Sequence, residues 1–401
     1  MSSIIGSITR RALGGVALVT AAGWSLGAAQ AADTIKVGVI ISYTGQFADT
    51  GIQMDNGIKL YVKQHGDTVA GKKIEFIRKD NGGMLPDVAK RLAQELVVRD
   101  KVDILCGFEL TPNALAAADV SAEAKKFMVV MNAATSIITT KSPYMARTSV
   151  TTPMLNETLG TWAAENGVKT AYTMATDYGP GIDAEQGFWT GFKGKGGTIV
   201  GSVRTPVDNP DFSSYLQRAK DSGADAIYIW VPGGSQPAAV GKALAARNID
   251  AQKTKVLGQD ALAFEDTLKN MGDAGIGIIT AAMYDYTHNS EMNKKFVAEY
   301  NAEFKRNPDI YSVGGYDGAA LIYQAIAKTG GKVDGESLIG AAKGMAWESP
   351  RGPISIDPET RDIVENVYIR KVVKHGDKLE NEEFATVPNV KDPVKARMGK
   401  N

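Results

Sequence analysis

The sequence is poor in the residues that build metal centres and disulfides. Its 401 residues include one cysteine and three histidines. Cys106, the single cysteine, excludes an intrachain disulfide and lies in "VDILCGF", which is typical of a buried strand. His65, His288 and His375 stand far apart and form neither HExxH nor a Cys/His pattern. The sequence therefore predicts no metal site and no cofactor.

Motifs of catalysis and of nucleic-acid binding are also missing. The chain has no GxSxG, no P-loop and no GxGxxG after its first predicted strand, and nothing pairs a nucleophile with a base. It has no basic run, and 45 basic residues balance 45 acidic ones. These absences predict a protein that is not an enzyme and has no nucleic-acid partner.

The N-terminus has the features of an export signal. Arg10 and Arg11 precede a weakly apolar stretch that ends in a small-x-small triplet at residues 29–31. This pattern predicts a signal peptide over residues 1–31 and a periplasmic destination. The arginine pair partly resembles a twin-arginine signal, although Ala12 stands where Phe is usual. The alternative is an uncleaved anchor, which the short, Gly- and Ala-rich apolar run disfavours.

Beyond the signal, short apolar strands alternate with helical patterns. Strands are predicted at 34–41, 72–80, 102–108, 127–131, 169–175, 197–204, 224–231, 254–259 and 275–283. Helices are predicted at 51–66, 86–100, 112–126, 154–167, 181–196, 211–223, 235–248, 289–307 and 314–330, before a closing hairpin over 352–378. This alternation predicts an α/β fold of βαβ units with mostly parallel sheets, and the length favours more than one domain.

Seven segments, in this order, resemble one known family. They read "IKVGVIISYTGQFADTGIQMDNGIKLYV", "VDILCGFELTPNALAAADV", "FMVVMNAATS", "DYGPG", "NPDFSSYLQRAKDSGADAIYI", "YDGAALIYQAI" and "ESPRGPISIDPETRD". Together they resemble the periplasmic solute-binding proteins of ABC transporters, of the leucine/isoleucine/valine-binding type. The resemblance covers essentially the whole chain after the signal.

The resemblance implies an architecture and a partner. The family has two Rossmann-like lobes joined by three crossover segments, and hinge closure buries the ligand in the cleft between the lobes. By resemblance, residues 33–150 and 284–347 form the first lobe, and 151–283 and 348–401 the second. The chain would act as a monomer that delivers its ligand to a membrane permease. Ligands of open α/β sheets bind at the carboxyl ends of strands, which indicates the loops after residues 41, 107, 131, 175, 231 and 258.

The segment "MNAATS" follows a predicted buried strand with small and polar residues, which suits a backbone that approaches a ligand. Backbone N–H groups and hydroxyls can hold a carboxylate without a cationic side chain. The resemblance implies that Thr111, Ala133 and Thr135 grip the carboxylate and amino groups of the ligand. The alternative is that the two threonines are only helix N-caps.

The resemblance also assigns residues to other parts of the ligand. Asp260 matches the position at which amino-acid binders place an acid for the ligand ammonium, and its alternative role is a helix N-cap. Tyr178 matches an aromatic residue that packs over the ligand, and Tyr316 another one near the hinge.

Three further residues, Phe47, Thr50 and Trp230, fall in the predicted cleft loops. Phe47 and Trp230 would form apolar walls, or would belong to the ordinary core. Many amino-acid binders carry an aromatic residue where Thr50 stands, so this departure leaves more room. The first ligand to consider is a branched-chain or other apolar amino acid, and the alternative is an aromatic carboxylate of the benzoate or cinnamate type. A periplasmic module that senses such a solute is the alternative class of protein.

Overall fold

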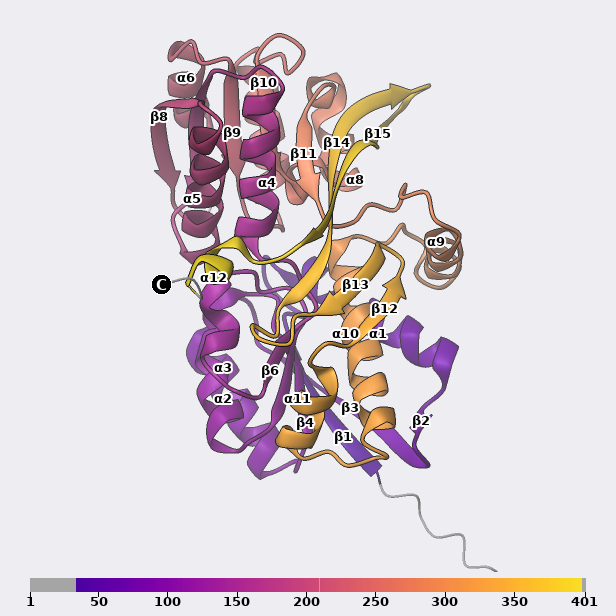
Figure 1. Ribbon diagram of the computed structural model, residues 1–401. Helices are drawn as coiled ribbons and strands as arrows, with labels where there is room; N and C mark the ends of the chain where they lie inside the picture. Colours follow the sequence, from indigo (N-terminus) through magenta and orange to yellow (C-terminus); the bar gives the residue numbers. More distant parts are fainter. Residues whose placement is uncertain (1–33, 209, 399–401) are drawn as a thin grey trace, which may run out of the picture. The chain divides into compact units, whose positions relative to one another are not determined.

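The computed structural model describes residues 34–208 and 210–398 (Figure 1). The predicted signal peptide, residues 1–31, lies outside the described residues. Strands and helices alternate along the described chain and build two mostly parallel sheets. The predicted α/β fold is therefore confirmed.

Six strands of the described chain form the first sheet, in the order β2-β3-β1-β4-β5-β6. Every neighbouring pair is parallel except β2 and β3. The central strands are apolar runs because helices cover both of their faces. The strands are β1 (Thr34–Ile41), β2 (Thr68–Val69), β3 (Lys72–Asp80), β4 (Ile104–Gly107), β5 (Phe127–Val130) and β6 (Met145–Arg147).

Two pairs of helices cover this sheet. Val37 and Val39 belong to the core cluster that includes α1 and α10, whereas Ile40 and Leu105 belong to the cluster that includes α2 and α3. We call this sheet with its helices the first half. Its helices are α1 (Ala48–His65), α2 (Pro86–Val98), α3 (Thr111–Glu123), the 3₁₀ turn η1 (Ser136–Thr140), α9 (Glu291–Phe304), α10 (Ile310–Lys328) and α11 (Gly335–Ala342).

The second sheet has the order β12-β13-β14-β11-β10-β9-β7-β8, and β15 pairs with β14. Strands β7 to β11 pair with one another in parallel, and every pair that includes one of the strands β12 to β15 is antiparallel. The strands are β7 (Thr170–Thr176), β8 (Thr198–Thr205), β9 (Ala226–Trp230), β10 (Lys255–Gln259), β11 (Ile279–Ala282), β12 (Ala346–Ser349), β13 (Gly352–Ile356), β14 (Ile363–His375) and β15 (Lys378–Val390). The predicted closing hairpin is confirmed as β13 and β14.

Helices also cover both faces of the parallel part of this sheet. Leu159 of α4 and Phe188 of α5 share a core cluster with Tyr228, and Leu216 of α6 and Val240 of α7 share another with Ile227. We call β7–β11 with these helices the second half. The helical elements are α4 (Thr152–Glu165), α5 (Gly179–Gly194), α6 (Ser213–Asp221), α7 (Gln236–Ala246), η2 (Asp260–Ala263), α8 (Glu265–Met271) and η3 (Gly272–Gly275).

The chain passes between the halves three times, after β6, after β11 and along β14. One fully buried arginine, Arg351, touches all three passages. Its guanidinium donates to the carbonyl oxygen of Thr148, contacts the Met283 sulfur at 3.0 Å and pairs with Glu365 at 2.9 Å. A fourth partner, Asp317 of α10, pairs with it at 2.8 Å. The three crossings thus share one charged centre.

Two segments near the end of the chain pack against the first half. Trp347 and Ser349 of β12 donate to Asp317 at 3.4 and 2.9 Å. The last helix of the described chain, α12 (Pro393–Met398), is yellow in Figure 1; it contacts α4, and its Lys395 donates to the Thr139 hydroxyl of η1. The lobe boundaries predicted from the sequence stay a prediction, because lobes are defined by how they move.

Cys106 lies in β4 and is fully buried, as the sequence predicts. Burial disfavours the thiolate and raises the pKa of this thiol. The cysteine is therefore a packing residue of the first sheet.

Candidate functional site

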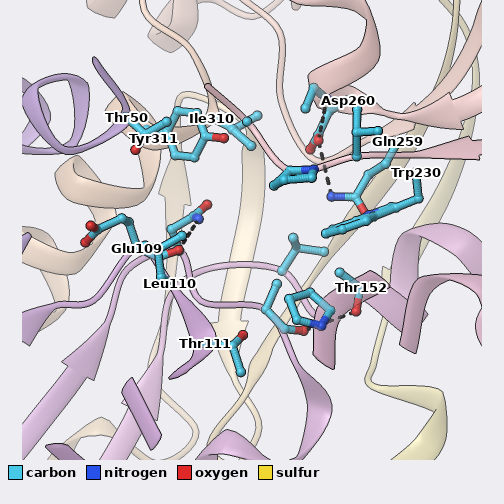
Figure 2. Close-up of a pocket in the computed structure, with 18 of the residues that line it drawn as sticks. Thr50, Glu109, Leu110, Thr111, Thr152, Trp230, Gln259, Asp260, Ile310 and Tyr311 are labelled. Carbon is cyan, nitrogen blue, oxygen red and sulfur yellow. Dashed lines mark hydrogen bonds between the residues drawn. The ribbon is translucent and has the colours of Figure 1, made fainter. Parts of the chain in front are cut away.

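A cavity of about 60 Å³ lies where the two halves meet (Figure 2). All six loops that the sequence indicates contribute to its lining, because each follows a parallel strand whose carboxyl end faces the cavity. In both sheets the strand order reverses here, between β3-β1 and β4 and between β8-β7 and β9. The cavity therefore lies at both topological switch points, where open α/β sheets bind ligands.

Three helix N-termini point to one end of this cavity. Thr111 opens α3, Thr152 opens α4, and Tyr178 with Pro180 lies at the start of α5. Each N-terminus carries unpaired N–H groups and a partial positive charge. Among the described residues that line the cavity, none is Lys, Arg or His. An anion bound here would be held by helix N-termini and hydroxyls.

The "MNAATS" loop lies behind this end and is fixed by hydrogen bonds. Asn132 donates to the Glu109 carbonyl at 2.8 Å, and the Ala133 N–H donates to the Phe108 carbonyl at 3.0 Å. From the other side, buried Arg147 donates to the carbonyls of Ala133 and Thr135 at 3.1 and 2.8 Å. The Thr135 backbone is therefore held independently of any ligand.

Aromatic side chains form the walls of the cavity. The rings of Tyr178 and Trp230 are 5.7 Å apart and tilted by 49°, and Phe47 and Tyr311 add further aromatic surface. The Trp230 indole donates to Gln259 Oε1 at 2.8 Å, which fixes the ring in place. These walls suit an apolar or aromatic ligand body.

An unpaired acceptor marks another part of the wall (Figure 2). Asp260 is fully buried, and its Oδ1 accepts from the Ala261 N–H at 2.7 Å and from Gln259 Nε2 at 3.3 Å. Its Oδ2 has no hydrogen-bond partner among the described residues. Burial raises the pKa of this carboxyl to about 6. Asp260 can thus accept a hydrogen bond from a hydroxyl or ammonium group of a ligand.

The structure brings six of the nine predicted site residues to the cavity. They are Phe47, Thr50, Thr111, Tyr178, Trp230 and Asp260. The Thr111 and Thr135 hydroxyls share a 3.0 Å hydrogen bond, so Thr135 lies one contact behind the lining. Ala133 is held in the loop described above. Thr111 is the first residue of α3, and no side-chain capping bond is described at α3 or at η1.

Tyr316 lies away from the cavity lining. It sits within α10, and its ring packs edge-on against Tyr61 and Phe296, with centroids 5.0 and 4.9 Å apart. Its hydroxyl donates to Gln64 Oε1 at 2.6 Å. Here its contacts are those of a packing residue between α10, α1 and α9.

Sequence reasoning missed several residues of the lining, among them Asn132, Val150, Thr152, Gln259, Ile310 and Tyr311. Two of them had a usable signal. Thr152 precedes Pro153 at a helix start, and Tyr311 follows Asp309, whose carboxylate accepts from the Tyr311 and Ser312 N–H groups. Helix starts near strand ends mark the cavity edge of such a fold.

Contacts between the halves enclose the cavity on two sides. On one side, the Ser136 N–H donates to Asp183 of α5 at 2.9 Å. On the other, Arg306 bridges Asp49 of α1 and Asp266 of α8, at 2.6 and 3.3 Å. The two halves are therefore closed over the cavity.

Two kinds of feature are absent from residues 34–208 and 210–398. No cluster of three or more His, Cys, Asp or Glu side chains there is arranged to hold a metal ion. Within the same ranges, no helix combines the length and the apolarity needed to cross a membrane.

Two α/β halves that enclose a small cavity at their switch points define a solute-binding protein. The chain belongs to the periplasmic binding protein family, whose model matches residues 34–377. Members of this family are solute-binding proteins rather than enzymes, and the chain is the solute-binding component of an ABC transporter.

The chain is similar to several known members. Leu/Ile/Val-binding protein homolog 6 of Brucella melitensis is 40% identical over 382 residues, which cover 94% of this chain and 98% of that protein. A solute-binding protein of Rhodopseudomonas palustris BisB5, solved with 3,4-dihydroxybenzoic acid, is 53% identical with a TM-score of 0.88, over 90% of this chain and 99% of that one. A second, from R. palustris HaA2 with p-hydroxybenzoic acid, is 43% identical with a TM-score of 0.88, over 91% of this chain and 100% of that one.

Proposed function

We propose that the protein captures a hydroxylated benzoate in the periplasm and delivers it to an ABC permease without altering it. The observation that carries the proposal is the layout of the cavity. Helix N-termini and Thr111 provide for a carboxylate, Tyr178 and Trp230 provide aromatic walls, and Asp260 provides a free acceptor. The similarity to proteins solved with hydroxylated benzoic acids supports the same class of ligand.

Each part of such a ligand has a counterpart in the cavity. The three helix N-termini would stabilise the carboxylate by partial charge, so no cationic side chain is needed. The ring would stack on the aromatic walls. A ring hydroxyl would donate to Asp260 Oδ2, which removes the cost of a buried unpaired acceptor.

Calorimetry and thermal shift with 3,4-dihydroxybenzoate, 4-hydroxybenzoate, benzoate and leucine test the proposal. The hydroxylated acids should bind tightest, benzoate more weakly and leucine weakest. A ligand at 100 times its Kd should add about 2.7 kcal/mol to the free energy of unfolding. Tight binding of leucine with no effect of the aromatic acids would contradict the proposal.

The second candidate ligand is an apolar amino acid, and Asp260 is the observation that favours it, since a buried carboxylate can pair with an ammonium. Asp260→Asn separates the two candidates. The asparagine oxygen would accept from the Ala261 N–H as Asp260 Oδ1 does, and the amide N–H would donate to the phenol oxygen, which can accept as well as donate, so the affinity for a hydroxybenzoate should fall by less than ~10-fold. The affinity for an amino acid should fall by ~10-fold or more.

We also propose that the protein is exported and its signal peptide removed. Cleavage after Ala31 would release a soluble protein into the periplasm as a monomer. Intact mass of the protein purified from the periplasm tests this, because the cleaved chain begins at Ala32. Recovery of the uncleaved chain in the membrane fraction would favour the anchor instead.

A further inference from the structure

The loop after β9 touches α10 across the cavity, and the contact is a glycine. Gly233 lines the cavity from the second half, and Tyr311 lines it from the first. A Cβ placed on Gly233 would lie 1.9 Å from Tyr311 Oη, 3.0 Å from Tyr311 Cζ and 3.4 Å from Thr50 Cγ2. In this arrangement no L-amino acid other than glycine fits at position 233.

Tyr311 cannot easily yield to such a side chain. Its side chain is 5% exposed, and its ring packs edge-on against Phe264 with a centroid distance of 5.9 Å. The N-terminus of its helix is held by Asp309, which accepts from the Tyr311 N–H at 3.0 Å. Because Tyr311 itself lines the cavity, a displaced ring would also disturb the space for a ligand.

We infer that Gly233 is a positioning residue for closure. Its bare Cα lets the loop after β9 reach Tyr311, and a side chain at 233 would hold the two halves apart and weaken ligand binding. The inference rests on the proposed function in one respect, namely that the ligand is held by closure. It assigns to Gly233 and Tyr311 a role as the pair that sets how far the halves close.

A second contact between the halves provides a graded comparison. A Cβ on Gly179 would lie 3.1 Å from Thr135 Oγ1, which requires a shift of only a few tenths of an ångström. Gly340 of α11 has no atom within 4 Å of an added Cβ. Alanine at 233, 179 and 340 should therefore have large, small and no effect on closure.

Calorimetry on the full mature protein measures these effects with 3,4-dihydroxybenzoate and with leucine as probes. Gly233→Ala should weaken whichever probe binds by ~10-fold or more, and Gly340→Ala, the matched control, should leave the affinity unchanged. Circular dichroism and thermal unfolding would show that both variants fold. Gly233→Ala with the affinity of the parent protein would overturn the inference.

A double-mutant cycle tests the contact itself. Tyr311→Phe removes the oxygen that an added Cβ would strike and leaves Cζ, at 3.0 Å. The fold-loss caused by Gly233→Ala should therefore be several times smaller in the Tyr311→Phe background. An equal loss in both backgrounds would overturn the inference, because a general effect on folding does not depend on the Tyr311 hydroxyl.

Distance measurement separates this inference from the choice of ligand. Spin labels on cysteines introduced at exposed Val98 and Val200 would report the separation of the halves with and without ligand. The parent protein should populate a short distance that Gly233→Ala lacks, even if neither probe is the true ligand. Failure of both probes to bind the parent would reject the proposed function alone. A short distance in Gly233→Ala equal to that in the parent, or its absence from the parent, would overturn the inference.

Discussion

At the scale of single residues, Thr111 and Thr135 show how a carboxylate could be held without a cation. Thr111 lies at the start of α3 and lines the cavity, and its hydroxyl is bonded to that of Thr135 at 3.0 Å. The second hydroxyl therefore orients the first. Arg147, which could have paired with a carboxylate, instead binds Asp362 at 2.6 Å and two carbonyls of the loop.

The two threonines should contribute unequally to ligand binding, because Thr111 lines the cavity and Thr135 lies behind it. Thr111→Val should weaken binding of a carboxylate ligand by about 1–3 kcal/mol, because a donor that faces the ligand is lost. Thr135→Val should cost about 0.5–1.5 kcal/mol, because only the orientation of Thr111 is affected. Calorimetry at one pH and salt concentration measures both. A larger effect of Thr135→Val would show that Thr135 meets the ligand directly.

The site residues differ in how far the sequence could predict them. Thr111 and Trp230 were within reach because each stands just after or at the end of a predicted parallel strand, and such ends converge in this fold. The position of Tyr316 away from the cavity could not be predicted, because nearly every residue of α10 is buried. The helix therefore has no polar face that would indicate which side of it faces the cavity. Gly233 reveals its contact only when the two halves are seen together.

At the scale of elements, α12 supports the loop after β5. Asp392 accepts from the Ser136 hydroxyl, and Lys395 pairs with Asp362 at 2.6 Å. Asp362 in turn holds Arg147, which binds the loop carbonyls. The last helix of the described chain therefore positions residues that the sequence places more than 200 positions earlier.

This support can be removed selectively. Asp392→Ala removes the acceptor of Ser136 and the carboxylate that caps Val394 and Lys395. It should lower the free energy of unfolding by about 1–2 kcal/mol and weaken ligand binding several-fold. Arg397→Gln is the control, because the half-exposed Arg397–Glu157 pair should contribute less than about 1 kcal/mol. Equal effects of the two changes, in urea unfolding and calorimetry, would count against a positioning role for α12.

Short elements were beyond the reach of the sequence. Most long strands and helices have clear periods, and their predicted limits agree with the structure to within a few residues, but the 13-residue strand β15 was not predicted. Helices α8, α11 and α12 span only six to eight residues, about two turns, which is too short for a helical period to stand out. Strand β14 runs between the two halves, and the sequence of the turn before it does not indicate this crossing.

At the scale of the whole molecule, buried acids link stability to pH. Burial raises the pKa values of Asp260 and Asp309 to about 6 and that of Glu365 to about 7. Each group binds its proton more tightly when folded than when unfolded. Their contribution to stability is therefore complete below about pH 4 and is lost as the pH rises through 6 and 7.

Glu365→Gln tests the largest of these contributions. The glutamine side chain at position 365 is uncharged at every pH. The free energy of unfolding of the variant should therefore fall less between pH 5 and pH 7 than that of the parent, by on the order of 1–2 kcal/mol. Urea unfolding at the two pH values measures the difference. Glu291→Gln is the control, because Lys294 lowers the pKa of Glu291, which places its titration below this range. The same slope in Glu365→Gln and in the parent would contradict the assignment.

The single cysteine of the chain is buried, which makes the purified protein suitable for labelling at a cysteine introduced elsewhere. Because Cys106 is inaccessible and its pKa is raised, a maleimide dye would leave it untouched while reacting with a cysteine introduced on the surface. Ile137 is 45% exposed and immediately follows Ser136, one of the residues that join the halves. A dye at that position would sense the halves meeting, so the protein could serve as a reagentless optical sensor for the solute it captures.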